Sequence, residues 1–352
     1  MNQLEVFHKT VNHVKTDQIL YYADFAPDLE LRLRQHFDFD SSIDLREHFG
    51  MYQPVNVSMK APDTLQTTDF DRYYKDMHIP ENSYIDHIGV LHIPGSMYHF
   101  THYISPLRNA ENFFDIKDYQ YYDYSNYTDE GMSERVKNAH SEGRIASCWL
   151  GHMYEDSWQI RGYEQFLEDL ILRPEWSNYI LDRIKEKNLI VAKAAAKAGV
   201  DVLKTGDDVA TQNSLIFSPH IWRSIMKPRW AEVYQEARNI KKDIQIWYHS
   251  DGNIDEIVQD LIEIGVTILN PVQPECMDPI KVKEKFGNIL TLDGTIGTQS
   301  IMPFGSAQQV EDYVIDRRET LGKNGGLILS PTHVLEPEVP IENILSFIKA
   351  CK

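Results

Sequence analysis

The sequence lacks long apolar runs, and this absence limits the classes of protein that it can encode. No stretch of 18 or more apolar residues occurs, which excludes an ordinary transmembrane helix. The first eight residues, Met1 to His8, contain neither a basic region nor an apolar region of the kind that secretory signals have. We therefore expect a cytoplasmic protein that does not bind membranes.

Cysteine and positive charge are also scarce. The three cysteines, Cys148, Cys276 and Cys351, form no CxxC pair, so a disulfide framework is excluded. Lys and Arg number 35 against 53 Asp and Glu, and the formal charge of -18 disfavours nucleic acid as a partner, because phosphate binding depends on clustered cations. The motifs GxGxxG, Walker A and GxSxG are absent, which disfavours dinucleotide enzymes and serine hydrolases.

Enough apolar material is present for a large core. Hydrophobic residues make up 42% of the 352 residues, and no Pro-rich or Gly/Ser-rich linker divides the chain. We therefore expect residues 1–352 to form a single domain. Its second half alternates helical patterns with short apolar runs, and weaker runs of the same kind occur earlier; together they are 55–59, 85–92, 145–150, 200–204, 243–248, 266–269, 288–292 and 326–329.

This βα alternation predicts a parallel sheet covered by helices. The total of about eight strands favours an α/β fold of the (β/α)₈ TIM barrel type, in which residues 1–50 form an N-terminal helical extension. In such barrels the chemistry takes place at the carboxyl ends of the strands. The polar residues that end the apolar runs are therefore the candidate site residues.

Those candidates include two histidines together with carboxylates and amides, and they are Asp207, Asp208, His249, Asp251, Asn270, Gln273, Asp293 and His333. Separate strands would direct these side chains to one mouth of the barrel, and this convergence predicts a functional site. Structural alternatives stay open for some of them. Asp207 and Asp208 could be a helix N-cap and its solvated neighbour, and the Asn270-Pro271 pair could be a purely structural turn.

The segment His249-Ser250-Asp251 has the spacing of a metal site, because alternate side chains of an extended segment lie on the same side. An imidazole nitrogen and a carboxylate oxygen both suit zinc, and an open catalytic site usually has three protein ligands. His333 is the candidate third ligand. In the alternative, His249 and His333 bind substrate or act in acid-base chemistry without a metal.

Several ordered blocks of the chain resemble the uroporphyrinogen decarboxylase superfamily, which also contains corrinoid-linked methyltransferases. The blocks extend over most of the chain and are 158–164, 206–208, 218–223, 227–229, 249–252, 270–274, 330–333 and 340–344. The resemblance implies a (β/α)₈ barrel, which agrees with the strand count. It also implies a homodimer, an expectation that rests on the resemblance alone.

Two departures from the family pattern bear on the activity. Decarboxylases of porphyrin biosynthesis carry an Arg-Gln-Ala-Gly-Arg-Tyr segment whose arginines hold substrate carboxylates, whereas the nearest string here is Arg34-Gln35-His36-Phe37. The zinc methyltransferases of the superfamily use His-x-Cys and a later Cys, whereas this chain has Asp251 and His333 near those places. A ligand set without thiolates suits an oxygen-type substrate better than a thiol.

The resemblance therefore implies O-demethylation, in which a methyl group passes from a small methoxylated or methylated compound to the corrinoid (cobalamin) of a separate partner protein. His249, Asp251 and His333, with zinc or as acids, would stabilise the leaving oxygen, and Asp207 or Asp208 would hold or proton-couple the substrate. Asn270, Gln273 and Asp293 complete the substrate-binding set. The chain has no Asp-x-His-x-x-Gly motif, so the corrinoid is expected on the partner.

Two alternatives to methyl transfer remain. One is a lyase of the uroporphyrinogen decarboxylase type, which acts on a tetrapyrrole or another carboxylic acid and needs no cofactor. The other is a tetrapyrrole or corrinoid binder without turnover. Methyl transfer requires a corrinoid, decarboxylation does not, and a binder forms a complex but no product.

Overall fold

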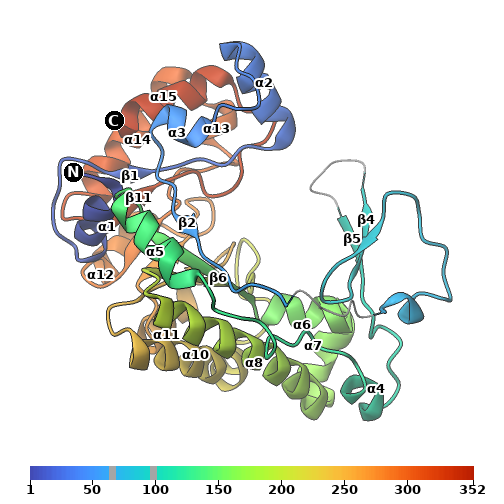
Figure 1. The fold of residues 1–352 in the computed structure, drawn as a ribbon. Helices are drawn as coiled ribbons and strands as arrows, with labels where there is room; N and C mark the ends of the chain where they lie inside the picture. Colours follow the sequence, from blue (N-terminus) through green and yellow to red (C-terminus); the bar gives the residue numbers. More distant parts are fainter. Residues whose placement is uncertain (63–68, 96–100) are drawn as a thin grey trace.

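The computed structural model describes residues 1–62, 69–95 and 101–352, and its central feature is a sheet of eight parallel strands (Figure 1). The order around the sheet is β1-β11-β10-β9-β8-β7-β6-β2. Across the gap between the edge strands, the Tyr52 N–H donates to the Tyr21 carbonyl at 2.7 Å. The predicted TIM-barrel-like α/β fold is thereby confirmed. The strands are β1 (Leu20–Tyr21), β2 (Val55–Asn56), β6 (Ala146–His152), β7 (Val202–Gly206), β8 (Gln245–His249), β9 (Ile268–Asn270), β10 (Thr291–Asp293) and β11 (Leu327–Leu329).

Helices cover the outside of this sheet (Figure 1). The longest described helix, α8, begins with Pro174 at its first position and ends at Ala198, before Gly199, whose φ of 91° is the left-handed conformation that favours glycine. The α-helices are α1 (Gln3–Val11), α2 (Pro27–Phe37), α3 (Leu45–Phe49), α4 (Phe113–Lys117), α5 (Met132–Ser141), α6 (Tyr154–Arg161), α7 (Tyr163–Leu172), α8 (Pro174–Ala198), α9 (Pro219–Ile221), α10 (Lys227–Ile240), α11 (Val258–Ile264), α12 (Pro279–Phe286), α13 (Ile301–Phe304), α14 (Ala307–Leu321) and α15 (Ile341–Cys351). Among the described residues, no helix is both long enough and apolar enough to cross a bilayer.

The predicted strand over residues 85–92 is wrong as a member of the barrel. The chain turns within this run, because the Asp86 carboxylate accepts hydrogen bonds from the N–H groups of Ile88 and Val90 and Gly89 takes a φ of 80°. Its two halves contribute to a separate antiparallel sheet. This sheet has the order β3-β4-β5, with β3 (Tyr84–Ile85), β4 (Leu91–Pro94) and β5 (Thr101–Ile104).

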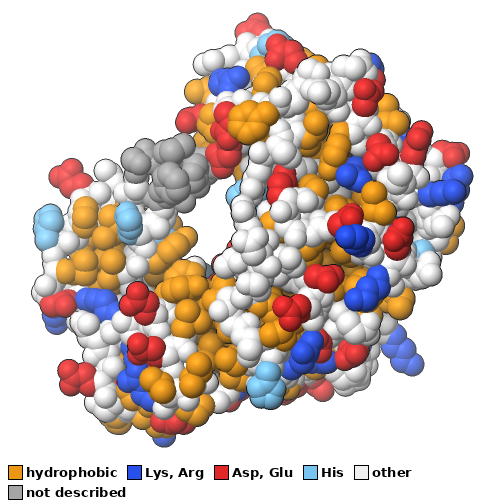
Figure 2. Space-filling view, turned by 180° about the vertical axis from the view of Figure 1, so that it is seen from behind, with side chains coloured by type: hydrophobic (Ala, Val, Ile, Leu, Met, Phe, Trp, Pro, Cys, Tyr) orange, Lys and Arg blue, Asp and Glu red, His pale blue; other side chains and the backbone are white. Residues whose placement is uncertain are grey.

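The eighth barrel strand comes from the N-terminal extension. Residues 1–50 hold the expected helices α1, α2 and α3, but they also contain β1, which pairs with β11 through the register Leu20 to Ile328. The small sheet β3-β4-β5 stands apart from the barrel, and Figure 2 shows a hollow between the two. Tyr103 of β5 contacts Trp158 of α6, with ring centroids 6.0 Å apart, and so connects the small sheet to the helix that follows β6.

Candidate functional site

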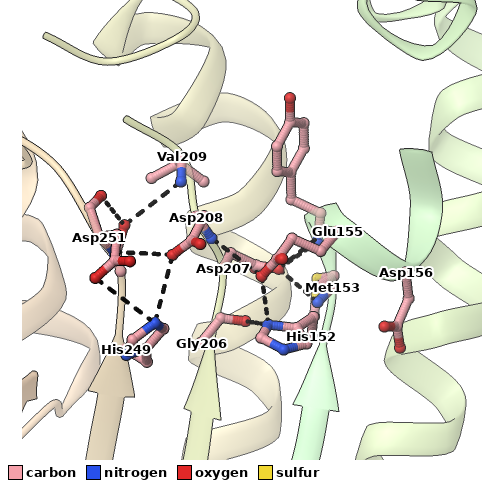
Figure 3. Close-up of polar contacts among 12 residues, drawn as sticks. His152, Met153, Glu155, Asp156, Gly206, Asp207, Asp208, Val209, His249 and Asp251 are labelled. Carbon is pink, nitrogen blue, oxygen red and sulfur yellow. Dashed lines mark hydrogen bonds and ion pairs between the residues drawn. The ribbon is translucent and has the colours of Figure 1, made fainter. Parts of the chain in front are cut away.

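Three side chains meet at the carboxyl ends of neighbouring strands. Asp208 follows β7, His249 ends β8, and Asp251 lies two residues further on (Figure 3). The Nε2 atom of His249 is 3.6 Å from Asp208 Oδ1 and 4.0 Å from Asp251 Oδ1. One ligand atom from each residue lies within 4.8 Å of the other two. The adjacent parallel strands β7 and β8 thus bring together two carboxylates and one imidazole.

Asn270 and Trp247 fix the orientation of His249. The Nδ1 atom of His249 lies 2.8 Å from Asn270 Oδ1, and the Asn270 amide donates in turn to the Tyr22 hydroxyl at 3.3 Å. An amide oxygen only accepts, so Nδ1 is the donor of this hydrogen bond and Nε2 is the ring nitrogen that faces the two carboxylates. The Trp247 ring lies nearly parallel to the imidazole, at 16° and 5.8 Å between centroids. A hydrogen bond on the far ring nitrogen is the usual arrangement of a metal-binding histidine.

One carboxylate oxygen of Asp251 has no hydrogen-bond partner. Its Oδ1 atom is buried and accepts no hydrogen bond from any described residue. Burial raises the pKa of Asp251; the charges of His249 and His333 oppose this shift, and that of Asp208 reinforces it. A buried carboxylate oxygen of this kind is costly unless a cation or a proton meets it. The set of Asp208, His249 and Asp251 therefore fits a divalent metal that takes nitrogen and oxygen ligands.

His333 lies near this group but outside it. The residue lines both an inner cavity of about 250 Å³, which reaches His249, and an outer cavity of about 400 Å³, which reaches Asp251. Of the three predicted metal ligands, the structure therefore gathers His249 and Asp251, and it adds Asp208 in place of His333. His333 lines the two cavities beside the group.

Asp207 binds the start of a helix with its carboxylate. Its Oδ1 accepts the backbone N–H groups of Met153, Tyr154 and Glu155 at 2.7, 2.6 and 3.3 Å, at the start of α6, and its Oδ2 accepts Trp230 Nε1 at 3.0 Å. Burial raises the pKa of Asp207 to about 7. Asp207 is not the N-cap residue of α6, which is Met153, but its carboxylate binds the start of α6 across the fold and so fixes the backbone from which Asp208 projects.

The other predicted polar residues support the walls of the site. Gln273 Oε1 accepts the Gly252 N–H at 2.7 Å, and Gly252 has a φ of 86°, so this contact holds the turn after Asp251. Asp293 accepts hydrogen bonds from Trp247 Nε1 at 2.7 Å, from Ser330 Oγ at 3.0 Å and from the Tyr22 hydroxyl at 3.2 Å. Burial raises the pKa of Asp293. Its hydrogen bonds fix the aromatic side chains of the inner cavity.

Several residues of the site were not predicted from the sequence. His152, at the end of β6, lies 2.6 Å from Glu155 Oε2, and the same oxygen accepts the Asp208 N–H at 3.2 Å. The strand-end rule, applied to the run 145–150, would have found His152. Tyr22 follows a strand of two residues, which is too short to show a periodic pattern.

The His152–Glu155 pair predicts a pH-dependent stability. Burial lowers the pKa of His152, but the hydrogen bond and charge of Glu155 outweigh this and raise it to about 9, above the 6.5 of an unperturbed histidine. Protonated His152 therefore stabilises the fold fully below pH 6.5, and this contribution is lost as the pH rises through 9. We expect the free energy of unfolding to fall by about 1–3 kcal/mol over this interval.

Denaturant titrations at several pH values measure this effect. The Glu155→Gln variant removes the negative partner of His152, so its free energy of unfolding should change less than that of the wild type between pH 6.5 and 9. Equal pH slopes for the two proteins would show that the pair does not act in this way.

Comparisons with known proteins concern the family and the fold. The family model for uroporphyrinogen decarboxylase (URO-D) matches residues 152–352, a range that includes Asp208, His249 and Asp251. Among solved structures, a methyltransferase from Methanosarcina mazei is similar with a TM-score of 0.68 and 16% identity, over 100% of this chain and 98% of that chain. At this identity the likeness supports the fold alone.

A psychrophilic glycoside hydrolase family 10 endo-beta-1,4-xylanase matches more weakly. Its TM-score is 0.38 at 8% identity, over 60% of this chain and 73% of that chain, which carries no argument. No curated protein matches the chain.

Proposed function

The chain belongs to the uroporphyrinogen decarboxylase family, and from this premise we propose that it is a methyltransferase. Its substrate is a small methoxylated compound, and its methyl acceptor is the corrinoid of a partner protein. The observation that carries the proposal is the group of Asp208, His249 and Asp251 at the mouth of a small cavity, in which Oδ1 of Asp251 is buried without a hydrogen-bond partner.

The three residues would hold a divalent cation, for which zinc is the expected metal because the ligands are one imidazole and two carboxylates. When bound, this cation supplies a Lewis acid that stabilises negative charge on a leaving oxygen. Asn270 keeps His249 in the required tautomer, and the Glu155 carboxylate holds the backbone of Asp208. These contacts keep the site arranged before a substrate enters.

Demethylation breaks the bond between the methyl carbon and oxygen, and the bonding pair stays on oxygen. The methyl group passes to the reduced cobalt of the acceptor, which provides the electron pair of the new bond. The oxygen then takes up a proton and leaves as an alcohol or phenol. His333 lines the cavities on either side of the site, and we assign it the delivery of this proton.

The inner cavity supports methyl transfer over porphyrinogen decarboxylation. Its volume is about 250 Å³, and Arg46 and Lys204 are the Lys and Arg residues among its described lining residues. Arg46 is already paired with Asp24. A tetrapyrrole with several carboxylates needs more guanidinium groups than this cavity offers, since arginine is the side chain that binds carboxylates in a bidentate manner.

An assay with free cob(I)alamin tests the proposal. The zinc-loaded protein is mixed with methoxylated compounds, and methylcobalamin formation is followed by absorbance under anaerobic conditions. We expect demethylated product when cob(I)alamin is present and none when it is omitted. Release of CO₂ without cob(I)alamin would instead support the decarboxylase-like lyase, and tight binding without turnover of any compound would support a binder.

A further inference from the structure

A lysine lies in the wall of the inner cavity, one layer below His249. Lys204 of β7 pairs in register with Trp247 of β8, and Gly206 pairs with His249. The Lys204 Nζ atom sits 4.3 Å from the centroid of the Trp247 ring. In the parts of the chain that the structure describes, we find no ion pair or hydrogen bond to this ammonium group.

The charges around Lys204 leave it available to a ligand. The nearby Asp293 carboxylate already accepts three hydrogen bonds from neutral groups, and the nearby Arg46 is paired with Asp24. Burial lowers the pKa of Lys204, and the charge of Asp293 opposes that shift. Lys204 is half-buried, and an ammonium group that is partly removed from water without a close anionic partner is costly; a bound anion would reduce that cost.

We propose that Lys204 binds the anionic group of a planar, aromatic methyl ether whose methoxy oxygen lies beside His249 and Asp251. This inference rests on the proposed function, and it adds the substrate class: a ring that carries a methoxy group on one side and a carboxylate on the opposite side. Neither the family match nor the structural neighbour specifies such a substrate.

The spacing of the two layers matches such a ring. Lys204 precedes Gly206 by two residues, so it lies about 6.6 Å deeper along the strand, at roughly 3.3 Å per residue. This depth is close to the distance between the methoxy oxygen and the carboxylate of a para-substituted benzene ring. A para-substituted ring with its methoxy oxygen at the level of His249 therefore places its carboxylate at the level of Lys204.

The cavity walls also suit a flat ring. The Trp247 and His249 rings are nearly parallel, and Tyr22 and Tyr52 line the cavity as well. Val202, Ile268 and Ile328 add apolar surface to the wall. Flat aromatic and aliphatic walls favour an aromatic ring over a branched, flexible ligand, because such a ring buries its faces and loses little conformational freedom.

Isothermal titration with a matched pair of ligands tests the inference without any corrinoid. The probes are 4-methoxybenzoate and its neutral isostere 4-methoxybenzamide, added to zinc-loaded protein at pH 7. We expect the wild type to bind the acid at least about 10-fold more tightly than the amide. Lys204→Met should remove this preference, and Lys204→Arg should keep part of it.

Lys241→Met is the matched control. The Lys241 side chain is 19% exposed and paired with Asp243, at the opposite end of β8, so its loss should leave the preference unchanged. Equal affinity of the wild type for acid and amide, or binding of neither, would overturn the inference. This comparison uses the wild type alone, so it does not depend on whether a variant folds. A strong acid preference without methyl transfer to cob(I)alamin would instead keep the anion site and contradict the proposed function.

Discussion

The Asp251→Ala variant is expected to lose about 10³-fold or more of the demethylation rate while it keeps its fold. The rate falls because the variant lacks one of the two carboxylates that hold the cation, and stabilisation of a leaving oxygen is one of the larger contributions to such catalysis. Stability is expected to be unchanged or about 1 kcal/mol higher, because the Oδ1 of Asp251 is buried without a hydrogen-bond partner.

Initial rates of methylcobalamin formation and thermal unfolding measure the two effects together. Asp255→Ala is the control, because Asp255 is an exposed carboxylate only four residues away and its loss should change neither quantity. Full activity of Asp251→Ala would remove this residue from the mechanism. A large loss of stability would show that the carboxylate has a structural partner instead.

The second expected effect is on metal binding. His249→Ala and Asp208→Ala should each weaken zinc affinity by about 10²-fold or more, because each removes one of three protein ligands. His333→Ala should keep the metal, since His333 lies outside the group whose ligand atoms are within 4.8 Å of one another. The same variant should nevertheless slow demethylation, because it removes the proposed proton donor.

Competition with a chromogenic chelator measures these affinities. If His333→Ala loses zinc and Asp208→Ala retains it, the ligand set expected from the sequence, His249, Asp251 and His333, is the correct one. If the wild type and all three variants are free of metal, His249 and Asp251 act as substrate-binding or acid-base groups.

The second half of the fold could be predicted because its elements carry strong local signals. Apolar runs that end abruptly in polar residues identified β7 to β11, and the structure brings Asp208, His249 and Asp251 together after β7 and β8. The pairing of His249 and Asp251 could also be predicted, because side chains two residues apart in an extended segment lie on the same side. Where a buried apolar run ends abruptly in polar residues, its sequence is enough.

The remaining features depend on tertiary contacts that no local pattern encodes. Strand β1 has two residues, and only its pairing with β11 makes it a strand. The choice of Asp208 over His333 as the third member of the group follows from the register between β7 and β8, whereas the loop after β11 sets the direction of His333. In the sequence, Lys204 is only the polar residue that ends an apolar run. Its position in the cavity wall becomes apparent only when the fold places it beside Trp247.

The fate of a labelled carbon tests the central claim most directly. Zinc-loaded protein and cob(I)alamin are incubated with two samples of 4-methoxybenzoate, one with ¹³C in the methoxy group and one with ¹³C in the carboxylate. Methyl transfer predicts that the methoxy label appears in methylcobalamin and that the carboxylate label stays in 4-hydroxybenzoate. Labelled CO₂ from the second sample, with an unlabelled corrinoid from the first, would contradict methyl transfer and establish a decarboxylase.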